Sequence, residues 1–298
     1  MRRLVSFAGT AALSALLACE PTGPPPYGFD QEATQPFVFE SEEQTDVDGS
    51  PATVVRYAEL ELEASPASGA RTELALRLHR YYMRVEGAPG GMSEIVLSPT
   101  GLVSRDPVQG EIRLDADESV PGGRTVAALL RQAVAGAVVR SDGVLVGSPW
   151  HSREATLRDL PLMGWILLAL PIVSDSEDRT WTGRRPVPPL GQYRLGIDIP
   201  LRFERVDALG QEIRSSGFVR RDTIELAEGY RGLLELDFAG EASLSPAGAV
   251  REARLQLQAI FRAEQGHEIR AHYRARLRCA DCRPAVNPAP EGSDTPEG

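Results

Sequence analysis

The sequence contains no lysine, so all 32 of its basic residues are arginines, against 42 acidic residues. The formal net charge is −10 at pH 7. An acidic chain has no overall attraction for nucleic acid or for anionic lipid, so we expect no nucleic-acid partner. Abundant alanine, glycine and proline beside the missing lysine indicate a GC-rich genome rather than a need for guanidinium chemistry.

Histidine is scarce and the common catalytic motifs are missing. There is no glycine-rich phosphate loop, no HExxH motif and no GxSxG nucleophile elbow. A carboxylate cluster at Asp115, Asp117 and Glu118 could do acid–base work, but 42 acidic residues produce such clusters by chance. His267 and His272 are five residues apart, which places them on opposite faces of a strand and disfavours a zinc site. The sequence therefore predicts no enzyme, no catalytic residue, no cofactor and no metal.

Cysteine is limited to three residues, and the first lies in a processing signal. Arg2 and Arg3 precede an apolar run of signal-peptide length, which is too short to span a bilayer comfortably. The run ends in Leu16-Leu17-Ala18-Cys19, which resembles a bacterial lipobox. The resemblance implies cleavage after residue 18, a diacylglycerol on the Cys19 sulfur and an N-linked fatty acid such as palmitate. The alternative is a conventional or uncleaved signal peptide with an incidental cysteine.

An N-terminal lipid of this kind would place the protein in the cell envelope. Several acyl chains together hold a protein stably on a membrane, whereas one chain is marginal. Glu20, rather than aspartate, follows Cys19. By analogy with enteric sorting this favours the outer membrane of a Gram-negative bacterium.

The other two cysteines, Cys279 and Cys282, form a CxxC pair near the end of the chain. In an oxidising compartment the pair predicts a short-range disulfide. Thioredoxin-like redox chemistry needs the pair at the start of a helix, but here it follows a strand pattern and precedes Pro284. Arg283 stands where a c-type haem motif needs histidine.

Composition divides the chain into segments. Residues 19–50 are rich in proline and acidic residues without periodicity, which predicts a disordered tether. Residues 51–174 predict an N-terminal β lobe with helical segments, 175–190 a linker, 191–282 a C-terminal antiparallel β lobe, and 283–298 a disordered tail. Within 19–50, the run Gln44-x-Asp46-x-Asp48-Gly49 lacks the decisive carboxylates of a calcium loop and predicts a turn.

Alternating apolar and polar residues dominate the rest and predict a mainly β (α+β) fold. A change of phase near Arg80 predicts a β-bulge. Residues 124–139 have helical spacing and predict one helix. Residues 160–173 form an apolar run that predicts a buried helix, or a lid over an apolar cavity. The alternatives for the whole are two antiparallel β lobes or a large half-open barrel or sandwich with one or two central helices.

Two resemblances bear on function. Leu170-Pro171 and Trp181 resemble the joining segment of uncharacterised Gram-negative lipoproteins with tandem β lobes. The turn Leu97-Ser98-Pro99-Thr100-Gly101 recurs as Leu244-Ser245-Pro246-Ala247-Gly248, which agrees with a duplication. The long amphipathic strands also resemble periplasmic lipoprotein carriers, which are half-open β-barrels with helices as a lid.

The last predicted hairpin has a basic face made by Arg270, His272, Arg274, Arg276 and Arg278. A three-residue loop at Gln265-Gly266-His267 would place Arg262 opposite Arg270 and Gln258 opposite Arg274. Opposed like charges are destabilising, so this face needs anions. They could come from neighbouring acidic strands such as Glu59-x-Glu61-x-Glu63 or the pair Glu235 and Asp237. They could also come from an anionic partner such as lipid A phosphates, a polyanionic glycan or an acidic protein surface.

Taken together, these features predict a membrane-anchored exported lipoprotein with a non-enzymatic β-rich domain that binds a partner or supports the envelope. The alternative is a periplasmic carrier of a lipid or other apolar ligand, gated by residues 160–173. An envelope hydrolase is a less favoured alternative.

Overall fold

The computed structural model describes residues 33–67, 71–88, 91–140, 143–151, 162–172, 178–189, 195–209, 211–226, 229–246 and 248–281. The first strands in chain order are β1 (Ala33–Val47), β2 (Ser50–Ala67), β3 (Arg71–Ala88), β4 (Gly91–Ser98), β5 (Gly101–Asp106) and β6 (Gly110–Asp115). The middle of the chain holds α1 (Gly123–Arg131), β7 (Ala133–Arg140), β8 (Leu145–His151), α2 (Leu162–Ala169) and β9 (Thr180–Pro186). The last strands are β10 (Asp198–Arg205), β11 (Glu212–Glu225), β12 (Arg231–Leu244), β13 (Val250–Ala263) and β14 (Glu268–Cys279).

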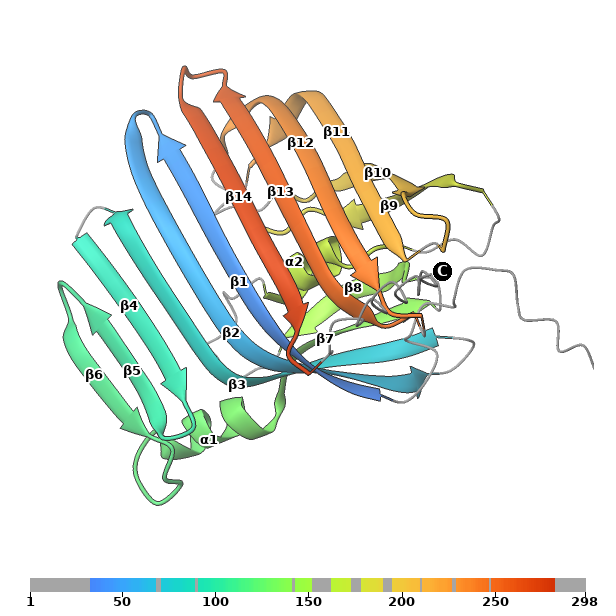
Figure 1. The fold of residues 1–298 in the computed structure, drawn as a ribbon. Coiled ribbons are helices and arrows are strands. Elements are labelled where there is room, and N and C mark those ends of the chain that lie inside the picture. Colours follow the sequence, from blue (N-terminus) through green and yellow to red (C-terminus); the bar gives the residue numbers. More distant parts are fainter. Residues whose placement is uncertain are drawn as a thin grey trace, which may run out of the picture.

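One antiparallel sheet contains all 14 described strands (Figure 1). Its order is β6-β5-β4-β3-β2-β1-β14-β13-β12-β11-β10-β9, and β7 adds to β3 with β8 beside it. Neighbours in the sheet are neighbours in sequence except at the β1–β14 and β3–β7 pairs. The mainly β prediction is therefore confirmed. The sheet is open, because β6 and β9 lie at opposite ends of the order and do not pair.

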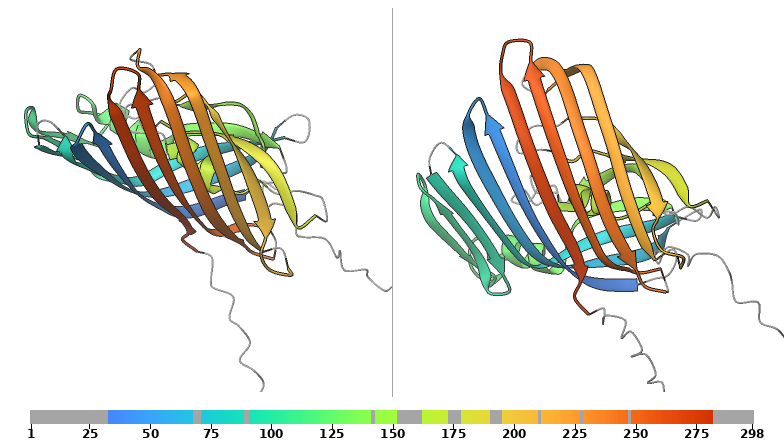
Figure 2. Two further views of the ribbon diagram at one scale, coloured as in Figure 1. Left: turned by 90° about the horizontal axis from the view of Figure 1, so that it is seen from above. Right: turned by 45° about the horizontal axis from the view of Figure 1, so that its top comes forward.

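The sheet is long, twisted and curved, and the two helices lie beside it (Figures 1 and 2). Helix α2 packs against β12, β13 and β14 and also contacts β7 and β9. We call the face that carries α2 the inner face, and the opposite one the outer face. Helix α1 contacts β3, β5 and β6. The two helices of the described residues agree with the predicted one or two.

Alternation along the strands sorts side chains between these faces, as period-2 geometry requires. In β12 the residues Leu234, Leu236 and Phe238 are buried, whereas Glu235 and Asp237 face outward. The buried sets of β2, β13 and β14 follow the same rule. The predicted bulge near Arg80 is also confirmed, because Glu59 pairs with Arg80 while Leu60 pairs with Leu78.

The predicted tether is wrong from Ala33 onward. Residues 33–47 form β1, which pairs with β2 on one side and with β14 on the other, at the centre of the sheet. The turn predicted over Gln44 to Gly49 is confirmed only at its last two residues, with φ of 52° at Asp48 and 83° at Gly49, whereas residues 44–47 belong to β1. The linker prediction is also wrong in part, since Thr180–Pro186 is the edge strand β9. The two halves share one sheet rather than forming separate lobes.

The predicted helix over residues 124–139 is correct only as far as Arg131. Residues 133–140 form β7 instead, with Ala137 opposite Leu74 of β3. Glycine is needed at position 136 of this strand, because a Cβ there would lie 2.4 Å from the Trp150 ring and 2.6 Å from the Leu74 carbonyl oxygen. Close approach of this glycine to its neighbours, together with the β-branched Val138 and Val139, favours the strand over the helix.

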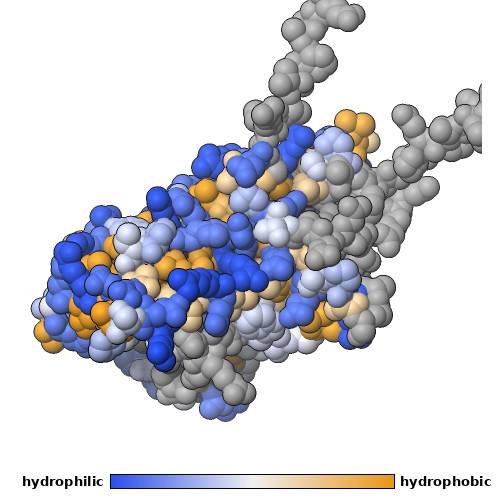
Figure 3. Space-filling model, turned by 90° about the horizontal axis from the view of Figure 1, so that it is seen from below, coloured by the Kyte–Doolittle hydropathy of each residue, from blue (hydrophilic) through white to orange (hydrophobic). Residues whose placement is uncertain are grey.

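Residues 162–169 form the predicted buried helix. All of its residues except Gly164 are buried. A helix that is apolar on every side is stable only when it is covered on every side. Among the described residues, no helix has the length and apolarity needed to cross a membrane. Seen from below, the surface is mostly hydrophilic with scattered apolar patches (Figure 3).

Candidate functional site

A buried ion pair lies on the inner face, where most neighbours are apolar. Arg56 Nη2 of β2 donates to Glu43 Oε2 of β1 at 2.9 Å. The side chains are only 7% and 1% exposed. Moving two charges out of water costs several kcal/mol each, so a buried pair is not explained by stability alone.

Three further polar side chains surround this pair: Ser41 of β1, Tyr81 of β3 and Tyr273 of β14. Ser41 is directly opposite Arg56, and Tyr273 is directly opposite Glu43. Burial raises the pKa of both tyrosine hydroxyls, so both stay protonated at neutral pH. Burial alone would lower the pKa of Arg56, but the Glu43 carboxylate reverses that shift and raises it. We call these five residues the inner polar cluster.

The inner polar cluster holds more polar atoms than it pairs. Within the described residues, Nε and Nη1 of Arg56, both tyrosine hydroxyls and the Ser41 Oγ make no hydrogen bond of good geometry. The Tyr81 hydroxyl still lies close enough to Arg56, and the Tyr273 hydroxyl to Ser41, for each contact to lower the tyrosine pKa against the larger effect of burial. Buried polar atoms in native proteins are almost always paired with protein, ordered water or ligand. The cluster therefore has unused capacity to donate hydrogen bonds to an anionic or carbonyl-bearing group.

Helix α2 covers this part of the sheet. The Trp165 ring stacks on Tyr273, with ring centroids 3.4 Å apart and an interplanar angle of 12°. Trp165 Nε1 is a further buried atom without a hydrogen bond in the described structure. The buried Arg185 of β9 donates to the carbonyl oxygen of Leu170, just after α2, at 3.3 Å, and to that of Gly143 at 2.6 Å. An arginine of a neighbouring strand thus holds the end of α2 in place.

The predicted basic face on β14 lies on the outer face, and its arginines differ in their partners. Arg270 contacts Glu268 at 2.5 Å and Arg276 contacts Glu252 at 2.7 Å. Arg274 Nε lies 3.4 Å from His272 Nε2, the one polar contact of this side chain within the described residues. Arg278 contacts no carboxylate of the described chain. The face is therefore only partly neutralised.

The last hairpin has the predicted kind of loop in a different register. Ala263 N donates to His267 O at 2.8 Å, so the loop is Glu264-Gln265-Gly266 rather than Gln265-Gly266-His267. Gly266 has φ of 92°, the left-handed conformation that suits the last residue of such a loop. The loop begins one residue earlier than predicted, and this shifts the pairing between β13 and β14 by two residues. Arg274 consequently faces Gln256, and Arg262 faces Glu268.

Of the predicted acidic neighbours of the last hairpin, Glu235 is confirmed through its contact with Arg262, whereas the stripe on β2 is wrong. The stripe Glu59, Glu61 and Glu63 contacts Arg80, His79 and Arg77 of β3 instead. The carboxylates beside β14 come from β1, where Glu40 faces Arg276, Glu42 faces Arg274 and Asp46 faces Arg270. These three residues belong to the segment predicted as a tether. Glu235, the other predicted source, contacts Arg220 and Arg262.

The remaining predicted sites have structural roles or lie outside the described residues. Asp117 Oδ1 accepts the Ser119 N–H at 2.9 Å and Glu118 contacts Arg131, so the carboxylate cluster shapes a turn. Cys19 and Cys282 lie outside the described residues, so lipidation and the Cys279–Cys282 disulfide stay predictions. No group of three or more metal-ligating side chains occurs in the described part of the chain.

Sequence comparisons return no family: no family model and no curated protein matches the chain. Solved structures give distant likenesses only. A structure of lipovitellin, concerned with its lipid–protein interactions, has 8% identity and a TM-score of 0.46. The match covers 87% of this chain but only 26% of that one.

Two bacterial structures are also similar over most of the chain. OccK5 of Pseudomonas aeruginosa has 9% identity and a TM-score of 0.30, covering 84% of this chain and 98% of that one. A DUF1329 family protein of Desulfovibrio piger has 12% identity and a TM-score of 0.17, covering 86% and 89%. At these values the likenesses assign neither a family nor a function.

Proposed function

We propose that this chain is an exported, lipid-anchored envelope protein that binds an amphipathic ligand on the inner face of its open sheet. The observation that carries the ligand proposal is the inner polar cluster beneath the wholly apolar α2. The anchor rests on the lipobox at Leu16–Cys19.

The two parts of the inner face match the two parts of an amphipathic molecule. Arg56, with its unpaired Nε and Nη1, and the protonated Tyr81 and Tyr273 hydroxyls would donate to an anionic head group. The apolar tail would lie along the inner side chains of β12–β14, in the place that α2 takes. Because α2 carries no charged residue, an apolar tail could replace α2 against the sheet at little electrostatic cost.

A second candidate is a support domain without a ligand. The filled interior favours it, because Met163, Trp165 and Ile166 of α2 are fully buried against the sheet. On this alternative the inner polar cluster would be satisfied by ordered water. The two candidates differ in whether α2 moves.

The test is mass spectrometry of lipids that co-purify, without detergent, with the full chain carrying Cys19→Ala. This change removes covalently attached acyl chains. We expect a stoichiometric anionic amphiphile, and we expect Arg56→Gln to deplete it strongly. Arg262→Gln is the matched control, because Arg262 is an ion-paired arginine on the outer face. A ligand-free spectrum, or equal depletion by both variants, would favour the support domain.

A further inference from the structure

A polar valley crosses the outer face at right angles to the strands. Two adjoining hollows, of ≈ 630 Å³ and ≈ 470 Å³, share Arg254, Leu255 and Gln256. Together they run from β10 to β2 across seven neighbouring strands. At the usual spacing of strands, this is a path of about 29 Å.

Cross-strand pairing shows how the valley is built. One wall is a row of outward residues that pair in register: Arg202, Ser216, Ala239, Gln256, Arg274 and Glu42. The other wall is the row two residues away on each strand: Glu204, Arg214, Glu241, Arg254, Arg276 and Glu40. Between them, Gly240, Leu255, Ala275 and Ser41 form the floor. Their side chains, where present, point inward, so the floor is peptide backbone.

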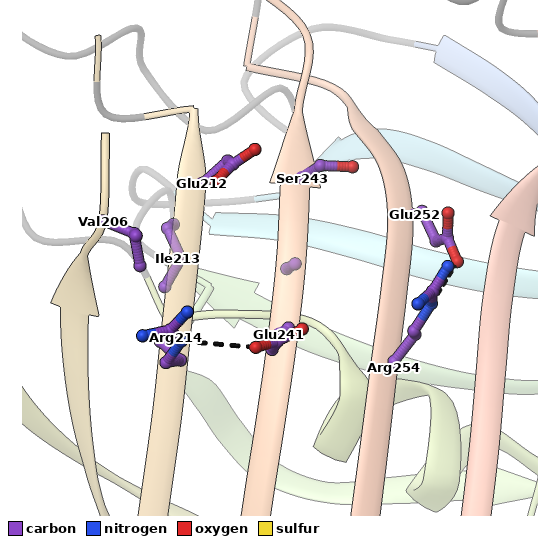
Figure 4. Close-up of a pocket in the computed structure, with 9 residues that line it drawn as sticks. Val206, Glu212, Ile213, Arg214, Glu241, Ser243, Glu252 and Arg254 are labelled. Atoms are coloured by element: carbon purple, nitrogen blue, oxygen red, sulfur yellow. Dashed lines mark hydrogen bonds and ion pairs between the residues drawn. The ribbon is translucent and has the colours of Figure 1, made fainter. Parts of the chain in front are cut away.

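Most charged side chains of the second wall form ion pairs. Arg214 contacts Glu241 at 3.2 Å, and Glu252 bridges Arg254 and Arg276 at 2.5 and 2.7 Å. Figure 4 shows Arg214, Glu241 and Arg254 in a line across β11, β12 and β13. Glu252 has a lowered pKa, because its hydrogen bonds to the two arginines outweigh the effect of burial.

The first wall is different, because its guanidinium groups form no ion pair with a carboxylate of the described residues, although Glu42 of the same wall lies opposite Arg274 in register. Arg202 has no hydrogen bond or ion pair within the described chain, and Arg274 contacts only His272. Both side chains are exposed. Four strand spacings separate them, or about 19 Å. Between them lie only the uncharged Ser216, Ala239 and Gln256.

We propose that this valley binds a linear polysaccharide that carries widely spaced acidic groups, such as uronic acids. The two unpaired guanidiniums would receive carboxylates some distance apart along the chain, as bidentate pairs. Sugar hydroxyls both donate and accept hydrogen bonds, so they would bond to Ser216, Gln256 and the fixed carboxylates of the second wall.

Other extended polymers fit this valley less well. The backbone of the floor is already paired within the sheet, so a peptide cannot add as a strand. A dense polyanion such as nucleic acid would meet Glu40, Glu42 and Glu241 and a protein of net charge −10. A sparsely charged glycan avoids both difficulties.

The test is isothermal titration of the full chain with an oligogalacturonate whose carboxyl groups are mostly methyl-esterified, so that the free ones are widely spaced, with dextran as a neutral glycan and poly-L-glutamate as an anionic peptide. We expect oligogalacturonate to bind and the other two to bind at least tenfold more weakly. The double variant Arg202→Gln/Arg274→Gln should weaken oligogalacturonate binding at least tenfold. Arg278→Gln is the matched control, since it removes an unpaired outward arginine of the same strand and should leave binding unchanged.

Three results would overturn the proposal. The first is no binding of oligogalacturonate to the unmodified chain. The second is equal loss of binding in the Arg278→Gln control and in the double variant, which would show general charge attraction. The third is binding of poly-L-glutamate as tightly as oligogalacturonate, which would show an acidic peptide site instead. All the substituted positions are exposed, where changes of this kind shift stability by less than about 0.5 kcal/mol.

Discussion

At the scale of single residues, the inner polar cluster is the feature that departs most from the rest of the sheet. Elsewhere the inward positions of β1 and β2 hold Phe37, Phe39, Ala58 and Leu60. A buried pair such as Glu43–Arg56 is weak evidence for stability, but loss of one partner leaves a charge in an apolar place. Loss of one partner therefore costs much more in a buried pair than in the many exposed ion pairs on the outer face.

We predict that Glu43→Leu lowers the free energy of unfolding by about 3–5 kcal/mol, because Arg56 then stays buried without its carboxylate. Urea denaturation measures the change. The matched control is Glu63→Leu, which breaks a pair with Arg77 whose side chains are 38% and 37% exposed. That change should cost about 0–1 kcal/mol. Similar losses in the two variants would show that the Glu43–Arg56 environment is not special.

The same residues explain why β1 could not be predicted from the sequence. Apolar alternation starts at Phe37 and Phe39 but then meets Ser41 and Glu43 at inward positions. A strand with polar residues on its buried face has no period-2 signal, so a search for hydrophobic alternation misses it. Functional or strained sites are where such local rules fail. The burial of Arg56, which lies just before the clear alternation of β2, could not be predicted for the same reason.

At the scale of elements, the two central hairpins depend on their turns. The loop Glu264-Gln265-Gly266 differs from the predicted one by a single residue, yet it changes every pair between β13 and β14. The odd loop length followed from the apolar phase of the strands. Which three residues form the loop depends on where the left-handed glycine sits, and alternation does not contain that information.

A contact between turns joins these hairpins. Asp48 in the β1–β2 turn accepts the Glu268 N–H at 2.8 Å through Oδ1, and its Oδ2 lies 2.5 Å from His267 Nδ1. The backbone hydrogen bond from Glu268, followed by the contact with His267, lowers the pKa of Asp48. A carboxyl group whose pKa is lower in the folded state stabilises the fold above its unfolded pKa. That stabilisation disappears as the pH falls through the folded pKa.

We predict that Asp48→Asn reduces the free energy of unfolding at pH 7 and that the difference from the unmodified chain shrinks below about pH 4, where the aspartate of the unfolded chain is protonated. Asparagine tolerates the left-handed backbone at this position, so the change tests the charge rather than the turn. Urea denaturation from pH 7 to pH 2.5 measures it. A difference that stays constant down to pH 2.5 would contradict the role of the carboxylate.

At the scale of the whole molecule, the first and last described strands pair with each other in the middle of the sheet. The β1–β14 pair joins residues more than 200 positions apart, from Phe37↔Cys279 to Val47↔Ile269. Strand identities of the second half could be read from alternation, because sequential hairpins are local. The β1–β14 and β3–β7 pairs could not, because no local pattern specifies which distant edge a strand will meet.

This pairing also bounds the geometry of the proposed anchor. Because the sheet begins at Ala33 instead of residue 51, the chain between Cys19 and the fold can span at most about 50 Å when fully extended. We predict that Cys19→Ala moves the protein from the membrane fraction to the soluble fraction and abolishes labelling by a fatty-acid analogue, because the thiol that would carry the diacylglycerol is gone. Cys282→Ala is the control, and it should leave both fractionation and labelling unchanged. If the Cys19→Ala chain still sedimented with membranes and still took up the label, the lipobox interpretation would be wrong.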